Sequence, residues 1–385
     1  ARPVYLDGHA TTPLDSRVLA AMLPYFTEQF GNAASRTHAY GWEAAAAVER
    51  AREQLAAGLG AQPEELVFTS GATEADNLAV KGVVEAARAR GDHVVVSSIE
   101  HPAVLDPCLH LERLGFRVTR VPVGASGVVG PEDVARAVEA GTVLVSVMLA
   151  NNEVGTIQPV REIAALVRAR GVPVHTDAAQ AVGKIPVDVR DLDVDLLSLS
   201  GHKLQGPKGV GALYVRRGGL ASLVAQQDGG GHERGRRAGT LDVPAIVGLG
   251  CAVGLAVGEG AAEQKRLRAL RDRLLAGLAR EIEGLVVNGD LERRLPGSLN
   301  VSVPGLPADA IVGGLREIAI STGSACASAS LEPSRVLRAM GLPDEVARGS
   351  LRFGLGRWTG EADVDLAIRA VAERVATLRA SAGMS

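Results

Sequence analysis

The chain has 385 residues, of which 46% are apolar, and a formal net charge of −3. This length predicts two or three structural units and an easily buried core. No basic tract is present and aromatic residues make up only 3% of the chain, so nucleic acid is a poor candidate for a direct partner. We also expect no apolar run of membrane-spanning length, and "ARPVYLDGHATTP" lacks the pattern of a signal peptide.

Strand-like runs alternate with Ala-rich helical segments from residue 66 onward. The expected strands are residues 66–70, 93–98, 117–123, 142–149, 172–178, 195–200 and 211–215, with helices such as Glu74–Arg90 and Val160–Arg170 between several of them. Nearly all-apolar strands that alternate with helices indicate a mostly parallel sheet covered on both faces. Because only a Gly-rich turn separates the last two runs, we expect one strand to be antiparallel.

The character of the sequence changes from about Leu249. A long charged helix, Ala261–Glu283, is expected to begin a smaller α+β domain. Strands at 298–303, 318–322 and 350–356 and a helix at 361–379 complete this domain. The predicted boundaries are residues 15–257 for the large domain, and 1–14 with 258–385 for the small domain.

The three cysteines, Cys108, Cys251 and Cys326, form no close pairs in the sequence. Such a sparse, odd-numbered set is typical of a reducing compartment, so we expect a cytoplasmic protein without a disulfide framework. Cys251, within "VGLGCAVGLAV", is expected in the core, and Cys108, within "LDPCLHL", on a helix face.

Residues that could bind a ligand follow several of the expected strands, at the point where each strand ends. They are Gly71-Ala72-Thr73, His101, Asn151-Asn152, Asp177 and Lys203. In an open α/β sheet, ligands bind at the carboxyl ends of the strands. Each residue alone has an ordinary alternative: a helix-start turn, a helix-start histidine, turn-forming asparagines, an N-cap aspartate and a solvated loop lysine. Lys208 fits that last alternative better than Lys203 does.

The order of these residues favours a common site. A phosphate cradle, a stacking imidazole, a carboxylate for a pyridinium nitrogen and an amine for a Schiff base are what pyridoxal phosphate requires. The Gly- and Arg-rich segment "DGGGHERGRRAGT" (228–240), judged by composition alone, predicts a mobile surface loop.

Longer motifs across nearly the whole chain then become informative. They are "YLDGHATTP" (5–13), "FGNAASRTHAYG" (30–41), "FTSGATEADNLA" (68–79), "EHPAVL" (100–105), "NNEVGTIQP" (151–159), "HTDAAQAVGK" (175–184), "SGHKLQGPKGVGALYVRR" (200–217), "GGGHERGRRAGT" (229–240), "STGSACASAS" (321–330) and "LRFGLGRW" (351–358). With these motifs the chain resembles the cysteine desulfurases of the NifS/IscS type. The resemblance implies a pyridoxal-phosphate-dependent transferase of fold type I, like aspartate aminotransferase, with a mostly parallel seven-stranded sheet and a smaller α+β domain.

The resemblance also implies roles for matching residues. Lys203 would form the Schiff base, Asp177 would pair with the pyridinium nitrogen, Gln180 would bond the phenolic oxygen and His101 would stack on the ring. Ala72, Thr73, Ser200 and His202 would hold the phosphate, and Asn152 would also contact the cofactor. Thr240 would reach the phosphate of the neighbouring subunit of a homodimer. Asn152 and Arg352 would hold the carboxylate of the substrate, L-cysteine, and Asn32 would also bind the substrate.

Cys326 is the residue that the implied chemistry depends on most. Its segment "SACAS" has small side chains and no apolar anchor, which predicts a mobile loop. The resemblance implies that Lys203 removes the α-proton, that His101 serves as acid and base, and that the Cys326 thiolate takes the sulfur as L-alanine leaves. The persulfide would pass to an Fe–S scaffold or another acceptor protein. No metal site is expected in the chain itself, although Cys326 could contact a cluster on an acceptor.

Three alternatives remain open. An aminotransferase of the same fold would not need Cys326, and a selenocysteine lyase would also use a loop cysteine, although residues 321–331 resemble the longer loop of the sulfur-relay type. A degenerate homologue that acts as a scaffold would be expected to lack Lys203, Asp177 or Cys326. The chain departs from many relatives at Gly8-His9, at Gln205 and in its short C-terminus. We interpret His9 as a residue that lines the domain junction and not as part of the active site.

Overall fold

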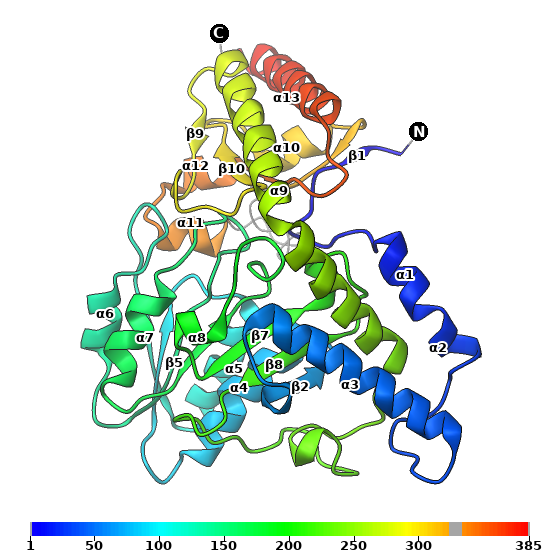
Figure 1. Cartoon of the computed structure of the whole chain (residues 1–385). Helices are drawn as coiled ribbons and strands as arrows, with labels where there is room; N and C mark the ends of the chain where they lie inside the picture. The colour runs from blue at the N-terminus through cyan, green and yellow to red at the C-terminus, as the bar shows by residue number, and fades with distance from the viewer. Residues whose placement is uncertain (1, 323–332, 384–385) are drawn as a thin grey trace.

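The computed structural model describes residues 2–322 and 333–383. The chain forms a larger and a smaller unit (Figure 1). The larger unit is built on a seven-stranded sheet of β2 (Leu66–Thr69), β3 (His93–Ser97), β4 (Arg117–Val121), β5 (Thr142–Ser146), β6 (Val174–Asp177), β7 (Leu196–Ser200) and β8 (Gly211–Val215). Their order across the sheet is β2-β8-β7-β6-β5-β3-β4. β8 is antiparallel to both of its neighbours, and the other pairs are parallel, which confirms the predicted sheet.

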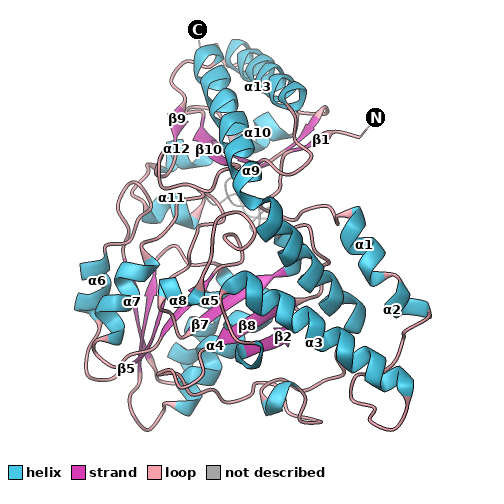
Figure 2. Ribbon diagram, in the orientation of Figure 1, coloured by secondary structure: helices cyan, strands magenta, loops and turns pink. Residues whose placement is uncertain are grey.

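Alternate residues of the strands enter different cores, because successive side chains point to opposite faces of a sheet. Val94 and Val96 pack with helices α4 (Ala72–Ala86) and α5 (Pro102–Arg113), whereas Val95 packs in the core that contains α3 (Ala39–Leu59). The helices therefore cover the sheet on both sides (Figure 2). The remaining helices of this unit are α1 (Ser16–Met22), α2 (Pro24–Thr27), α6 (Pro131–Ala137), α7 (Val160–Arg168) and α8 (Val189–Leu192), with 3-10 turns η1 (Pro63–Glu65), η2 (Gly201–Lys203) and η3 (Glu233–Gly235).

The smaller unit has a core of its own around an antiparallel sheet. This sheet has the order β12-β13-β10-β9, and β1 pairs with β11 beside it. The elements are β1 (Val4–Tyr5), β9 (Val286–Val287), β10 (Ser298–Ser302), β11 (Ile318–Ala319), β12 (Ser321–Thr322), β13 (Ser350–Gly354), α10 (Ala308–Val312), α11 (Arg335–Ala339), α12 (Asp344–Arg348) and α13 (Glu361–Ser381). The single strand expected at 318–322 is therefore wrong, since β11 and β12 pair in different sheets. The domain boundaries given above stay a prediction.

Helix α9 (Val243–Glu281) connects the two units as one continuous helix of 39 residues (Figure 1). The sequence predicted a helix only from Ala261, because glycines disfavour the helix before it. Tertiary packing explains the difference. A Cβ added to Gly250 would lie 2.8 Å from the Cα of Ala51 in α3, so glycine is what allows the two helices to approach so closely.

The same helix corrects the expectation that no apolar run could span a membrane. By length and composition α9 is long and apolar enough, although 44% of its most apolar stretch is buried within the protein. Ile246, Leu249 and Val253 lie in the core that contains α3. Packing against α3 therefore accounts for the apolar side of this helix.

Of the two cysteines in the described chain, Cys108 lies on a helix face as expected, and Cys251 differs from its expected position. Cys108 is fully buried on the inward face of α5, whereas Cys251, expected in the core, is only partly buried in α9. Burial raises the pKa of the Cys108 thiol to about 12, so this side chain stays a neutral thiol at physiological pH.

The Gly- and Arg-rich loop (228–240) is attached to the core by a buried ion pair. Glu233 Oε1 lies 2.7 Å from Arg52 Nη2, and both side chains are almost fully buried. Glu233 Oε2 also accepts a hydrogen bond from the backbone N–H of Phe68. Composition predicted a mobile surface loop, and this prediction is wrong at Glu233, because composition does not reveal a partner that lies 181 residues away.

Candidate active site

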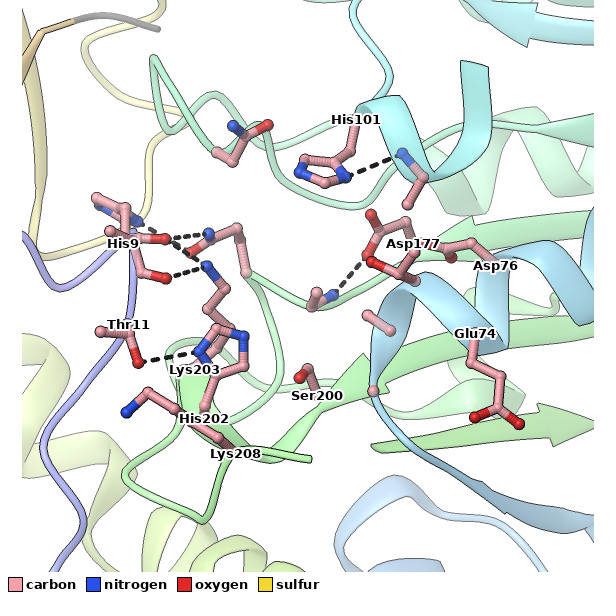
Figure 3. Close-up of a pocket in the computed structure, with 18 of the residues that line it drawn as sticks. His9, Thr11, Glu74, Asp76, His101, Asp177, Ser200, His202, Lys203 and Lys208 are labelled. Carbon is pink, nitrogen blue, oxygen red and sulfur yellow. Dashed lines mark hydrogen bonds between the residues drawn. The ribbon is translucent and has the colours of Figure 1, made fainter. Parts of the chain in front are cut away.

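A cavity of about 590 Å³ opens at the carboxyl ends of the parallel strands (Figure 3). Its wall contains ten of the residues predicted from the sequence: Ala72, Thr73, His101, Asn152, Asp177, Gln180, Ser200, His202, Lys203 and Arg352. β3 and β5 are neighbours in the sheet although β4 lies between them in sequence, so the strand order reverses here. Ligands of open α/β sheets bind at such reversals, which explains why residues distant in sequence meet in this cavity.

The start of α4 forms one end of the cavity. Gly71 is its N-cap residue, with φ of 153°, and it supplies no side-chain cap for the first helical N–H groups. Helix N-termini of this kind attract phosphate groups. Ser200 at the end of β7 and His202 lie beside this helix start (Figure 3). Burial and nearby lysines lower the pKa of His202 to about 4, so its ring is neutral at physiological pH.

Asp177 and His101 form another part of the cavity wall (Figure 3). Asp177 Oδ1 accepts a hydrogen bond from the backbone N–H of Ala179, at 2.8 Å. Burial raises the pKa of Asp177, while the charges of His101 and Lys203 act in the opposite direction. A buried carboxylate is costly without a cationic partner, so this position suits a positively charged ligand atom.

His101 is the N-cap of α5 and its Nδ1 lies 3.1 Å from the backbone N–H of Ala103. A backbone N–H can only donate, so Nδ1 is the acceptor and the neutral ring carries its proton on Nε2. Burial lowers the pKa of His101. Its chemistry is therefore that of a neutral imidazole whose tautomer is fixed by the helix start.

The N-terminal segment reaches Lys203 from the small unit. Lys203 Nζ donates to the backbone oxygens of His9, at 2.6 Å, and of Ala10, at 2.7 Å. Thr12 further binds the backbone oxygen of His202. Residues 9–12 thus lie over the strand end that presents the lysine, although His9 precedes Lys203 by 194 residues in the sequence.

His9 is a site residue that the sequence interpretation placed elsewhere. It is 4% exposed, lines the cavity, and its Nδ1 lies 3.0 Å from Gln180 Oε1. The preference for a residue that only lines the domain junction is therefore wrong. The signal was the departure of Gly8-His9 from the related motif, but a motif does not indicate which way the ring points.

Asp76 is another residue that the sequence analysis missed. It lies one turn into α4, is fully buried, lines the cavity and has its Oδ1 3.5 Å from His175 Nε2. Burial and the neighbouring charge of Asp177 raise its pKa well above the ordinary value. The available signal was a carboxylate among the apolar, inward-facing positions Ala75, Leu78 and Ala79.

Arg352 on β13 closes the cavity from the small unit. Its Nη2 lies 2.9 Å from Asp7 Oδ1, and its Nη1 donates to the backbone oxygen of Asn152 at 3.1 Å. Its Nε is buried and has no hydrogen-bond partner among the described residues. This guanidinium therefore retains donor capacity beside Asn152, as an anion-binding group requires.

Two predicted site residues that the structure describes, Asn32 and Thr240, do not line this cavity. Asn32 is exposed before α3, where its Oδ1 accepts from the backbone N–H of Ala34. Thr240 is exposed at the end of the Gly- and Arg-rich loop. Cys326, together with its expected mobile loop, lies outside the described residues. Lys208, assigned to solvent from the sequence, is exposed and lines the rim of the cavity.

The chain belongs to the class-V aminotransferase family, whose model matches residues 4–366. It is 55% identical over 377 residues to "Cysteine desulfurase IscS" of Anaeromyxobacter sp. (strain Fw109-5), a match that covers 98% of this chain and 93% of that protein. The solved structure of a "NIFS-LIKE PROTEIN" has a TM-score of 0.91 and 39% identity, with 97% of this chain and 100% of that chain covered. The structure of "SspA in complex with cysteine" has a TM-score of 0.81 and 38% identity, with coverages of 91% and 98%.

These likenesses confirm the family and the fold type expected from the motifs. Enzymes of this family use pyridoxal phosphate. The cavity fits this cofactor, because an uncapped helix start, a buried carboxylate and a lysine amine line the same space.

Proposed function

We propose that the protein is a pyridoxal-phosphate-dependent cysteine desulfurase, which removes sulfur from L-cysteine and releases L-alanine. The observation that supports this most is the convergence of Lys203, Asp177, His101 and the α4 N-terminus in one cavity, in a chain 55% identical to a cysteine desulfurase. Bound pyridoxal phosphate would supply an electron sink for the α-carbon of the substrate.

We assign the cofactor contacts to residues of the cavity wall. Ala72, Thr73, Ser200 and His202 would hold the phosphate, supported by their position at the start of α4 and the end of β7. Asp177 would pair with the ring nitrogen, His101 would stack on the ring, and Gln180 and Asn152 would contact its edge. Lys203 would provide the Schiff-base amine.

The substrate would be bound by its carboxylate. Arg352 and Asn152 are adjacent in the wall, and the buried Nε of Arg352 supports this assignment. Asn32 would join them only if a loop or a second subunit brings it to the cavity. Lys203 would then move the α-proton, and His101 would donate and accept protons in the sulfur steps.

Sulfur transfer would depend on Cys326. Its thiolate attacks the substrate sulfur, an S–S bond forms, and the C–S bond breaks with its electron pair on carbon. That carbon takes up a proton and becomes the methyl group of alanine, while a persulfide stays on Cys326. An acceptor protein, such as an Fe–S scaffold, would then take the sulfur. We propose a cytoplasmic location from the sparse cysteines alone.

We propose a homodimer in which Thr240 reaches the partner's site. The exposure of Thr240 outside its own cavity supports this arrangement. Exposed aromatic side chains gather in residues 26–42, namely Phe26, Phe30, Tyr40 and Trp42, with exposures of 56%, 63%, 51% and 59%. Aromatic residues make up only 3% of the chain, so this concentration favours a protein interface.

The test is sulfide release from L-cysteine with dithiothreitol, together with the visible absorption of the bound cofactor. We expect Cys326→Ala to keep the cofactor absorption and to lose sulfide release by at least about 100-fold, because the sulfur has no acceptor. Cys251→Ala is the matched control, since Cys251 lies in α9 away from the cavity, and it should remain active.

Equal turnover by wild type and Cys326→Ala would overturn the persulfide step and favour a lyase or aminotransferase reaction at the same site. A purified protein without cofactor absorption after incubation with pyridoxal phosphate would overturn the assignment of Lys203. A higher rate with L-selenocysteine than with L-cysteine would reassign the substrate.

A further inference from the structure

Gln180 lines the main cavity, and its amide has three hydrogen-bond contacts with two neighbouring residues. Gln180 Nε2 donates to the backbone oxygen of His9 at 2.9 Å. Gln180 Oε1 lies 3.0 Å from His9 Nδ1 and 2.6 Å from Lys184 Nζ. His9 lines both the main cavity and a second, small cavity of about 40 Å³, and Lys184 lines only the small one.

The hydrogen-bonding capacity of each partner fixes the orientation of this amide. The backbone oxygen of His9 can only accept, so the Gln180 atom facing it must be the NH2 group. Gln180 Oε1 therefore faces His9 Nδ1, and this nitrogen must carry a proton. Burial and the nearby charges of Lys184 and Arg352 lower the pKa of His9 well below its ordinary value, so the ring is neutral with its lone pair on Nε2.

The same hydrogen bonds determine what remains available to a ligand. Two lone pairs of Gln180 Oε1 are used by His9 Nδ1–H and by Lys184 Nζ, and one N–H of the amide is used by the His9 backbone oxygen. Within the described part of the chain, one N–H donor of Gln180 is left, in a side chain that lines the main cavity. If the amide were rotated, Gln180 Oε1 would lie 2.9 Å from the backbone oxygen of His9. The NH2 group of Gln180 would then face the N–H of His9 Nδ1.

We propose that His9 and Lys184 are positioning residues that hold Gln180 as a hydrogen-bond donor to the phenolic oxygen of the bound cofactor. This inference rests on the function proposed above and goes beyond it, because the side chains of His9 and Lys184 bind Gln180 and not the reacting atoms. A donor toward that oxygen stabilises its anionic form, so the proton affinity of the cofactor chromophore reports the orientation of Gln180.

The experiment is a visible-absorption pH titration of the holoenzyme and its variants. We expect Gln180→Leu to raise the pKa of the chromophore by about one pH unit or more, a tenfold change in proton affinity. His9→Leu and Lys184→Met remove the two donors to Oε1, and each should raise the same pKa by less. The double variant should shift furthest toward the value of Gln180→Leu, because only the backbone oxygen of His9 then still holds the amide.

Matched variants separate the loss of the hydrogen bonds to Gln180 Oε1 from the change in side-chain type at His9 and Lys184. His9→Asn keeps a short N–H donor near Gln180 and should titrate close to wild type, unlike His9→Leu. Burial lowers the pKa of Lys184 well below its ordinary value. Lys184→Gln keeps a neutral donor at this position, so it should shift the chromophore pKa less than Lys184→Met does. If the double variant does not fold, the comparison of His9→Asn with His9→Leu decides the question.

Three results would overturn the proposal. They are a double variant that titrates as wild type, a Gln180→Leu variant without any shift, and equal shifts in His9→Asn and His9→Leu. Failure of the proposed function is a different result, namely a wild-type protein that has no cofactor absorption or releases no sulfide from L-cysteine. If the wild type has normal cofactor absorption but catalyses a different reaction, the pH titration still tests the roles of His9 and Lys184.

Discussion

Glu100 is a carboxyl group enclosed between the ends of β3 and β5. It is 1% exposed, and its Oε1 accepts hydrogen bonds from Ser97 Oγ and from the backbone N–H of Met148. Burial raises the pKa of Glu100 to about 8, while these hydrogen bonds act in the opposite direction. Glu100 is therefore expected to be largely protonated in the folded protein at neutral pH.

We predict that Glu100→Gln becomes more stable relative to wild type as the pH rises. In wild type the folded state binds the Glu100 proton more tightly than the unfolded state does. That stabilisation is complete below the unfolded pKa and is lost as the pH rises through about 8. The relative gain of the variant should be on the order of a few kcal/mol, measured as free energies of unfolding in urea at about pH 5 and about pH 9.

A neutral Gln preserves the acceptor for Ser97 and Met148, so little change is expected at the acidic end. A constant difference in stability between the two proteins at both pH values would show that Glu100 is already ionised in the folded state.

The close contact between helices α3 and α9 depends on a glycine in α9. Gly250 lies where α9 meets α3, and a Cβ there would be 2.7 Å from Gln54 Oε1 and 2.8 Å from Ala51 Cα. Gly254, one turn later in the same helix, has nothing within 4 Å of the same position. We predict that Gly250→Ala destabilises the protein by about 1–3 kcal/mol, whereas Gly254→Ala stabilises it by about 0.5–1 kcal/mol.

Thermal or urea unfolding of the two variants measures this difference. Both changes raise helix propensity equally, so propensity cancels in the comparison. Equal stabilities would mean that α3 and α9 separate easily enough to admit a methyl group.

The Gly- and Arg-rich loop (228–240) offers a test of its buried ion pair. Arg52 binds Glu233, which is buried, and also Glu49, whose side chain is 55% exposed. We predict that Glu233→Leu costs about 3–5 kcal/mol, because the buried Arg52 cation then has only the exposed Glu49 as an ionic partner, besides its hydrogen bond to the backbone oxygen of Leu66. Glu49→Leu, the control on the same arginine, should cost less than about 1 kcal/mol.

The double variant Arg52→Met with Glu233→Leu should recover much of the lost stability in the same unfolding measurements, since both charges of the pair are then removed together. A loss in Glu233→Leu no larger than that in Glu49→Leu would show that water reaches Arg52 when the loop changes.

The exposed aromatic residues of positions 26–42 are the surface on which we expect two chains to associate. We predict that Phe30→Glu weakens a homodimer by at least about 100-fold, because it places a charge among the exposed aromatic residues of positions 26–42. Leu114→Glu is the control, since Leu114 is 54% exposed at the end of α5. Sedimentation velocity over a range of protein concentrations measures the dissociation constant.

A Phe30→Glu variant that still sediments as wild type would place any dimer contact elsewhere. If instead both proteins are monomers at all concentrations, Thr240 has no partner site to reach, and its assignment fails.

The sequence predicts the seven strands of the larger sheet, their mixed direction and most of the cavity wall. Its signals are local: apolar runs of strand length, turns rich in glycine, and one polar residue after each strand. Since the carboxyl ends of parallel strands lie at the same edge of a sheet, Asp177, His101 and Lys203 could be grouped before their positions were known. The motifs then indicated the family, which the similarity to known proteins confirmed.

Only the tertiary structure decided the contacts between distant segments. The positions of His9 against Gln180, Glu233 against Arg52, and Asp76 beside His175 depend on long-range packing, and burial is what shifts the pKa of His9 and Asp76. The unbroken α9 likewise exists because close packing on α3 outweighs the low helix propensity of its glycines. Local patterns specify secondary structure, whereas burial and pairing across the chain become defined only when the fold brings distant residues together.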